Sequence, residues 1–450
     1  MINKEKIFDL EIFFDSSNSN FSLSEVLLQN KKSYDFDNYK WKIDQVHQTF
    51  ITICINLSDM CNLKCDYCFN AVKSGKSIDI KLVKDFLSYI FKKFPDKEKY
   101  YIDLSGKGEP LLFLDKILKI KEYCINISNR IGKEVLVSFV SNGTLLSTEI
   151  ASVLQKNGIL FGVSLDGNEY VHNLHRKTNK GEDTYQTIIN NVKNIKNHEY
   201  VGAATTLTKD VFSLVDSIKE LGEVFNTVGY KPARNCLEAF DSESIDRWLV
   251  EYDKLTLFLL DECIKGNDKY IKILLNGDDY FGKFIKRILV GLKAHIRCDG
   301  GLSRVSLDDN DLVYICPSAF ENEDYVVGDI NHIDLEKQRR IFDEQISKSN
   351  CGNCSVKYFC GGECLIEKRL VNGNNALMCK YKKHLILLGM YFVLELVDKN
   401  YPMFVHIRQF AQSTLVRYQK DKELDKFLKE HPEYNFVEGK EIFDREYKKY

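Results

Sequence analysis

Three cysteines stand close together in the first part of the chain. Cys61, Cys65 and Cys68 have the spacing C-x3-C-x2-C, directly after an apolar, β-branched run. Three thiolates on one short loop can bind three irons of a [4Fe–4S] cluster. The fourth iron then has no protein ligand, and an open metal position is where a substrate or cofactor can coordinate. The spacing therefore predicts a cluster that takes part in chemistry.

A zinc site is the main alternative for these three cysteines. Structural zinc usually has four ligands, commonly completed by a second C-x2-C or a histidine pair. The neighbouring sequence offers neither, and His47 precedes the expected strand. The sequence thus favours iron and sulfide over zinc.

A second group of seven cysteines lies in the C-terminal part of the chain and includes the run C-x2-C-x5-C-x3-C. Its members are Cys298, Cys316, Cys351, Cys354, Cys360, Cys364 and Cys379. A zinc ribbon would fit Cys351 and Cys354 alone, but not the spacings that follow. The remaining cysteines lie on apolar stretches and are interpreted as small buried side chains: Cys54, Cys124, Cys236 and Cys263.

These cysteines must be positioned by a fold, and strands alternate with helical patterns from residue 51 to about 235. Strands are expected at 51–56, 100–105, 135–141, 159–165, 200–206 and 228–231. Helices are expected between them, at 80–94, 112–129, 147–157, 184–197 and 211–224. Such alternation predicts an α/β fold with a parallel sheet, and six units predict a partial (β/α)6 TIM-like barrel. Polar turn residues follow the strands, at the edge where such folds build their sites.

The rest of the chain divides by composition. We expect an N-terminal extension at 1–50, the barrel at 51–241 and a helical linker at 242–295. A small cysteine-rich domain is expected at 296–385, followed by C-terminal helices at 386–450, the last of them exposed.

Charge and hydropathy bear on partners and location. The net charge of −2 gives no electrostatic reason to expect nucleic acid or an anionic membrane as a partner. The N-terminus lacks the apolar core of a signal peptide. The most apolar run, Leu385 to Leu394, is too short to span a bilayer. A cytoplasmic protein is therefore expected, and there fourteen cysteines indicate metal rather than disulfides.

Taken together, the motifs between about 50 and 235 resemble the radical S-adenosylmethionine (SAM) superfamily, whose signature is C-x3-C-x-aromatic-C. Tyr67 stands at the aromatic position. Gly108-Glu109-Pro110 resembles the family's GGEP motif, with Lys107 in place of the first glycine and expected to point to solvent. Further matching segments are Ser141 to Thr144, and Val163 to Gly167 followed by His172 and Arg176.

The resemblance implies that SAM binds the open iron and yields a 5′-deoxyadenosyl radical, which takes a hydrogen atom from the substrate. It also implies five SAM contacts. Tyr67 would lie near the adenine, and Gly108 would let SAM approach closely. Glu109 would accept from the ammonium group, Ser164 would bind the ribose or methionine part, and Arg176 would bind the carboxylate.

The seven C-terminal cysteines resemble the SPASM domain of peptide- and protein-modifying enzymes, which holds two auxiliary [4Fe–4S] clusters. The resemblance implies a distal cluster on Cys351, Cys354, Cys360 and Cys379, and a proximal cluster on Cys298, Cys316 and Cys364. Three clusters are thus expected in all. The fourth iron of the proximal cluster is expected to be open, or bound by His295, Cys263, Cys236 or an acidic group.

The resemblance favours a maturase that crosslinks side chains of a ribosomally made precursor peptide, through C–C, ether or thioether bonds. The implied partners are that peptide and an electron donor such as flavodoxin or ferredoxin. An anaerobic sulfatase maturase is an alternative, but the residues after Cys316 and Cys364 depart from that group. A non-catalytic iron–sulfur electron-transfer protein is another. Residues 1–50 are too short for a full winged-helix leader-binding module, and no catalytic base is assigned.

Overall fold

The computed structural model describes most of the chain. The described residues are 2–15, 21–22, 50–68, 74–233, 236, 239–277, 279–290, 300–347, 351, 354–362, 364, 366 and 376–418.

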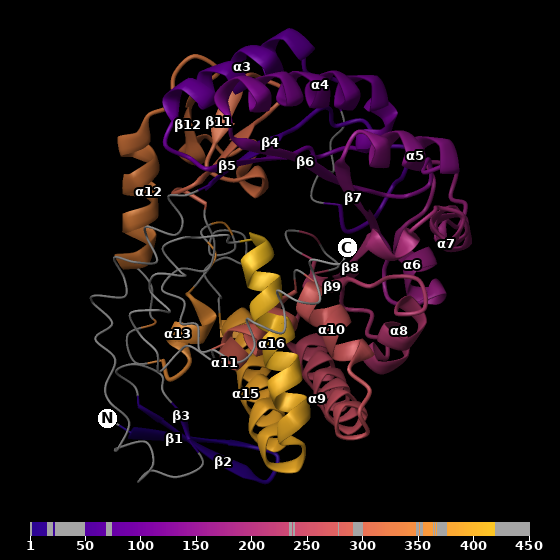
Figure 1. The fold of residues 1–450 in the computed structure, drawn as a ribbon, viewed down its shortest axis with the longest axis vertical. Coiled ribbons are helices and arrows are strands. Elements are labelled where there is room, and N and C mark those ends of the chain that lie inside the picture. The colour runs from indigo at the N-terminus through magenta and orange to yellow at the C-terminus, as the bar shows by residue number, and fades with distance from the viewer. Residues whose placement is uncertain are drawn as a thin grey trace.

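A curved sheet with six adjacent parallel strands forms the centre of the molecule (Figure 1). These strands are β4 (Phe50–Ile55), β5 (Lys99–Asp103), β6 (Glu134–Ser141), β7 (Ile159–Ser164), β8 (Gly202–Leu207) and β9 (Val228–Pro232). They pair in chain order, each parallel to the next. The predicted α/β fold with an incomplete barrel is therefore confirmed.

Helices cover the outer face of this sheet (Figure 1). They are α3 (Ile80–Lys93), α4 (Leu114–Ile131), α5 (Thr148–Lys156), α6 (Glu169–His175), α7 (Tyr185–Lys193) and α8 (Leu214–Leu221). Burial alternates along β5, where Tyr100 and Ile102 are buried and their neighbours less so. Successive strand residues point to opposite faces, so one set packs in the core and the other lines the barrel interior.

The sheet extends beyond the six predicted strands. β10 (Arg304–Leu307) pairs parallel to β4, and β11 (Leu312–Tyr314) and β12 (Val326–Asp329) follow antiparallel. The chain thus returns to the barrel after residue 300, and its cysteine-rich part begins on the same sheet as the first cysteine loop. The domain boundaries stay predictions. One sheet contains both β4, which precedes the predicted boundary at residue 296, and β10, which follows it.

Most of the helices that follow β9 lie in the lower half of Figure 1, whereas the one labelled α12 lies higher, beside the barrel. α9 (Ser242–Ile264), α10 (Lys269–Asn276) and α11 (Tyr280–Val290) precede α12 (Leu335–Ser347) and α13 (Lys357–Cys360). α15 (Ala376–Lys399) packs against α9 and α11, and α16 (Tyr401–Tyr418) follows it. The apolar run predicted as a buried helix lies in α15. The exposed helices expected at 404–450 are described only as far as Tyr418, where α16 buries Ile407 and Ala411 on one side.

The N-terminal residues form a small antiparallel sheet of β1 (Ile2–Ile7), β2 (Leu10–Asp15) and β3 (Phe21–Ser22). The ring of Phe8 packs edge-on against Tyr391 of α15, with ring centres 4.7 Å apart. Glu5 accepts a hydrogen bond from Ser355, which follows Cys354. Among the described helices, none combines the length and the hydropathy that crossing a bilayer would need.

Candidate active site

The first cysteine loop follows β4 at the carboxyl edge of the parallel strands. Its backbone is tied to the end of α6 and the segment after it, because Asp66 N–H donates to His175 O at 3.3 Å and Lys64 N–H donates to Lys177 O at 2.8 Å. Cys61, Cys65 and Cys68 are each partly exposed. The loop thus holds three accessible thiols at the edge where parallel αβ folds place their sites.

The sulfur atoms of this loop lie among hydrogen-bond donors. Cys61 Sγ accepts from Leu63 N–H at 3.4 Å and from Asn142 Nδ2 at 3.8 Å. Burial raises the pKa of the Cys65 thiol to about 11, although nearby Arg176 acts in the opposite direction. A bound metal would therefore have to displace the proton from this thiol.

Glu109 is buried beside the cysteine loop, with 2% of its surface exposed. Its N–H donates to Met60 O at 2.8 Å. Its carboxylate accepts from Leu111 N–H at 2.9 Å, Ser141 Oγ at 2.7 Å and Asn142 N–H at 2.6 Å. Burial raises the pKa of Glu109, although these donors favour the charged form. A carboxylate has about four acceptor sites, so three protein donors leave room for one more.

Gly108 has a structural reason to be glycine that the sequence did not reveal. A Cβ at this position would lie 2.7 Å from Ser58 O and closer still to Met60 O. The glycine therefore lets the loop after β5 lie directly on the backbone of the cysteine loop. The expected role, close approach of SAM, stays a prediction.

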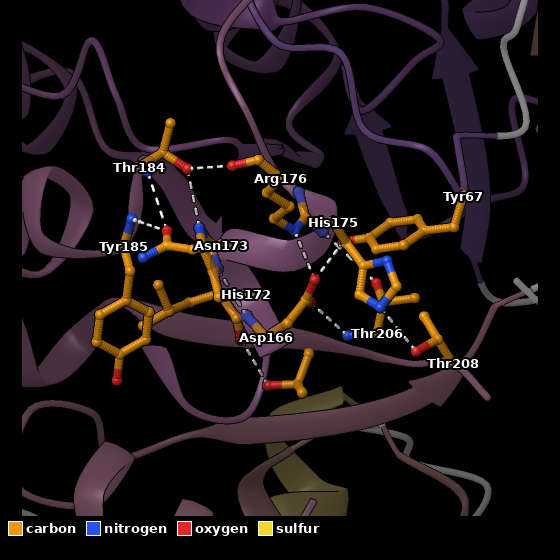
Figure 2. A network of polar contacts seen from close by, with 12 residues as sticks. Tyr67, Asp166, His172, Asn173, His175, Arg176, Thr184, Tyr185, Thr206 and Thr208 are labelled. Carbon is orange, nitrogen blue, oxygen red and sulfur yellow. Dashed lines mark hydrogen bonds and ion pairs between the residues drawn. The ribbon is translucent and has the colours of Figure 1, made fainter. Parts of the chain in front are cut away.

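Asp166 connects the cysteine loop to Arg176 (Figure 2). The carboxylate is fully buried, and Oδ2 accepts from Arg176 Nε at 2.8 Å and from the hydroxyl of Tyr67. Oδ1 accepts from Thr206 N–H at 2.7 Å. Burial works against the charged carboxylate, but Arg176 holds the pKa of Asp166 below its usual range. The Arg176 guanidinium also lies 5.2 Å from the centre of the Tyr67 ring.

Two histidines of α6 support this arrangement (Figure 2). His172 Nδ1 accepts from Asp166 N–H at 3.2 Å, and burial lowers the pKa of His172 to about 4, so it is neutral. His175 Nδ1 lies 2.9 Å from both carboxylate oxygens of Asp66. On its other side, Nε2 lies 3.1 Å from Thr208 Oγ1 and 3.2 Å from Asp210 Oδ2. His175 thus clamps the cysteine loop to the segment after β8.

The predicted SAM contacts therefore lie on neighbouring elements. Tyr67 and Arg176 are joined through Asp166, and Glu109 is joined to Cys61 through Asn142. Ser164 is the last residue of β7, partly exposed and two residues before Asp166. Asp166 and Asn142 belong to the sequence motifs, but the sequence alone did not predict that they would connect these residues. Sequence reasoning missed His175 altogether, although that residue directly precedes Arg176.

The expectation that Lys107 points to solvent is wrong. Only 6% of its side chain is exposed, and Nζ forms an ion pair with Glu321. Nζ also lies 5.5 Å from the centre of the Phe320 ring. The side chain crosses from the loop after β5 to the segment that follows Cys316.

The second cysteine group is only partly described, and Cys298 and His295 lie outside the described residues. Cys316 follows β11, Cys360 ends α13, and Cys379 lies in the first turn of α15. Cys354 N–H donates to Cys351 O at 3.1 Å, and Cys364 packs at the edge of the core. The described cysteines are all free thiols. The predicted ligand sets stay predictions.

The first cysteine loop fits an iron–sulfur cluster in its chemistry. It offers three thiols, N–H donors to sulfur and a nearby guanidinium, which suit an anionic cluster with thiolate ligands. Within the described ranges, no group of three or more His, Cys, Asp or Glu residues is close enough to hold a single metal ion. A cluster places its ligands on separate irons, so this spacing does not conflict with it.

Comparisons with known proteins agree with this geometry. Residues 55–211 match the family model of the radical SAM superfamily. A serine-type anaerobic sulfatase-maturating enzyme of Klebsiella aerogenes is 22% identical over 71% of this chain and 80% of its own length. An uncharacterised protein of Methanocaldococcus jannaschii is 29% identical over 30% of this chain, and the match spans 46% of that relative.

Among solved structures, native anSMEcpe with bound AdoMet and the Cp18Cys peptide has a similar fold. The TM-score is 0.62 at 18% sequence identity, and the match covers 80% of this chain and 99% of that one. At this level of identity the likeness shows the fold alone.

Proposed function

We propose that the chain is a peptide-modifying radical SAM enzyme, because residues 55–211 match the family model of the radical SAM superfamily. This match implies a [4Fe–4S] cluster and SAM. The proposal depends on one observation above all. The three-cysteine loop, the buried Glu109 carboxylate and the Arg176 guanidinium meet at the carboxyl edge of the barrel, linked through Asn142 and Asp166.

Each of these residues would have a distinct task. Cys61, Cys65 and Cys68 would hold the cluster and leave one iron free. Glu109 would use its remaining acceptor site for the SAM ammonium group, a charge-assisted bond. Arg176 would face the SAM carboxylate, with Asp166 fixing its orientation. Tyr67 would border the adenine and Ser164 the ribose or methionine part. When bound, the cluster and SAM would supply a 5′-deoxyadenosyl radical that takes a hydrogen atom from an unactivated carbon.

The cysteines between residues 296 and 385 would form a SPASM domain with two auxiliary clusters. The distal cluster would use Cys351, Cys354, Cys360 and Cys379, and the proximal cluster Cys298, Cys316 and Cys364. These clusters would accept the electron that the substrate loses after hydrogen abstraction. A full chain would then carry about twelve irons and twelve sulfides.

The substrate would be a ribosomally made precursor peptide, crosslinked between side chains. A peptide is bound to anSMEcpe, the solved structure with the similar fold. Flavodoxin or ferredoxin would supply the reducing electron, in the cytoplasm. Each crosslink removes two hydrogen atoms from the peptide, which mass spectrometry detects directly.

Two experiments test the proposal. The reconstituted, reduced full chain should cleave SAM to 5′-deoxyadenosine under anaerobic conditions. An electron-transfer protein or a zinc protein would not do so. Coexpression with a candidate precursor peptide should then lower the mass of that peptide by two hydrogens per crosslink, with the new bond located by fragmentation. A chain that cleaves no SAM would refute the proposal.

Maturation of a sulfatase is the second candidate, favoured by the similarity to the Klebsiella aerogenes enzyme. Against it, Pro317 and Ser318 follow Cys316, and Leu365 and Ile366 follow Cys364, so the residues expected of that group are missing. Incubation with a sulfatase-derived peptide distinguishes the two. Modification of that peptide in preference to a precursor peptide would favour the second candidate.

A further inference from the structure

Lys107 stands where the superfamily motif usually has a glycine, and its side chain makes defined contacts with another segment of the chain. Its neighbours Gly106 and Gly108 have no room for a side chain, because a Cβ on either would meet backbone or side-chain atoms closer than 3.0 Å. The loop itself is fixed, since Lys107 N–H donates to Asn56 Oδ1 at 2.9 Å and Glu109 N–H donates to Met60 O at 2.8 Å. Lys107 is thus a long cationic side chain on a loop that lies against the first cysteine loop.

The far end of this side chain contacts the segment after Cys316. Nζ pairs with Glu321 and lies 5.5 Å from the centre of the Phe320 ring. The two residues of the ion pair are 214 positions apart in sequence. The ring of Phe320 packs edge-on against Tyr314 of β11, with centres 5.3 Å apart. The contact therefore joins the loop after β5 to the segment that follows β11 and Cys316.

The backbone of this segment is held in an unusual conformation. Glu321 has a φ of 71°, a left-handed conformation that a non-glycine residue adopts only when its surroundings fix it. Short turns lead up to it, with Ala319 N–H donating to Cys316 O at 3.0 Å and Asn322 N–H donating to Ala319 O at 3.0 Å. The ion pair with Lys107 is a contact that can hold the turn in this shape.

The charge of Lys107 also reaches a carboxylate on another loop. Burial raises the pKa of Asp308 in the turn after β10, and Lys107 is among the groups that oppose the rise. The mostly buried ammonium group of Lys107 thus balances acidic side chains from two separate segments, Asp308 and Glu321.

We propose that Lys107 is a positioning residue that holds the segment from Cys316 to Glu321 against the SAM-binding edge of the barrel. This inference rests on the proposed function, because it assigns that edge to SAM and Cys316 to an auxiliary cluster. The lysine would set the distance between the two cysteine-bearing loops. A glycine, as the superfamily motif usually has here, could make no such contact.

Backbone hydrogen exchange on the full chain without cofactors tests this inference, with the amides of 319–325 as the readout and those of β5 as an internal reference. We expect Lys107→Met and Glu321→Gln each to speed exchange at 319–325 by roughly threefold or more, while β5 is unchanged. The double variant should be no faster than either single variant. Lys107→Arg should restore slow exchange, and Lys265→Met, at the exposed pair with Asp261, should have no effect.

Unchanged exchange at 319–325 in both single variants would overturn the inference, and so would a uniform increase that includes β5. If Lys107→Met does not fold, Glu321→Gln decides alone, because 68% of the Glu321 side chain is exposed and its replacement leaves the core intact. The measurement needs no SAM cleavage. Failure of the proposed function would appear separately, as a wild-type chain that forms no 5′-deoxyadenosine.

Discussion

Arg176 Nε donates a 2.8 Å hydrogen bond to Asp166 Oδ2, and the aspartate is fully buried. Because the same oxygen accepts from Tyr67, one carboxylate fixes a residue of the cysteine loop and the predicted SAM-binding arginine together. Removing charge from one partner of a buried pair leaves the other uncompensated, which costs more than the pair itself contributes.

We therefore predict that Asp166→Asn destabilises the protein by about 3 kcal/mol. The asparagine keeps the shape of the site but leaves the Arg176 guanidinium without its counter-charge. Denaturant unfolding of the full chain measures the effect. Asp261→Asn is the matched control, because its ion pair with Lys265 is exposed to solvent and should contribute little to stability. Equal losses in the free energy of unfolding would show that the buried pair stabilises the protein no more than the exposed pair does.

The second prediction concerns the cluster ligands. Alanine at Cys61, Cys65 or Cys68 should abolish formation of 5′-deoxyadenosine and lower the iron and sulfide content by about four each per chain. Cys124→Ala is the control, because Cys124 is fully buried in α4, away from the carboxyl edge of the sheet. It should keep both activity and iron. Full SAM cleavage by any of the three loop variants would contradict the assignment of that cysteine.

The sequence predicted the six parallel strands because each is a compact apolar run between helical patterns. The extension of the sheet could not be predicted in the same way. β10 has only four residues, and its partner β4 lies about 250 positions earlier. Short strands bury too few residues to show an alternation, and their pairing depends on tertiary contacts.

In the candidate site, too, local features could be predicted from the sequence, whereas contacts between distant residues could not. The spacing of Cys61, Cys65 and Cys68 is local, and it identified the loop. The contact between Tyr67 and Asp166 joins residues 99 positions apart, and the contact between Lys107 and Glu321 joins residues farther apart still. A side chain's partner across such distances is set by the fold, so the sequence named these residues without revealing which of them touch.

The third prediction follows from the close approach at Gly108. Gly108→Ala would press a methyl group against the carbonyls of Met60 and Ser58, and backbone atoms cannot move aside as a flexible side chain can. We expect it to destabilise the protein by about 2 kcal/mol and to reduce SAM cleavage strongly. Gly202→Ala is the matched control, since a Cβ there would meet only ordinary contacts, the nearest at 3.5 Å. Wild-type thermal stability in Gly108→Ala would rule out this packing argument.

The fourth prediction concerns pH and His175. Burial disfavours its charged form, but the carboxylates of Asp66 and Asp210 on either side outweigh burial and raise the pKa of His175 above its ordinary 6.5. A raised pKa in the folded state means that the folded protein binds the proton more tightly than the unfolded chain does. The resulting stabilisation is complete below pH 6.5 and is lost as the pH rises through the raised value.

The test compares the wild type with His175→Gln by unfolding at several pH values. The stability advantage of the wild type should be largest below pH 6.5 and should shrink as the pH rises through the folded pKa. His406→Gln is the matched control, because His406 is about half exposed and pairs with Asp268 away from the cysteine loop. The comparison with His406→Gln shows what the loss of an exposed His–Asp contact does to stability. A constant difference between the wild type and His175→Gln across the range would mean that His175 keeps one protonation state, and that it clamps the loop by hydrogen bonding alone.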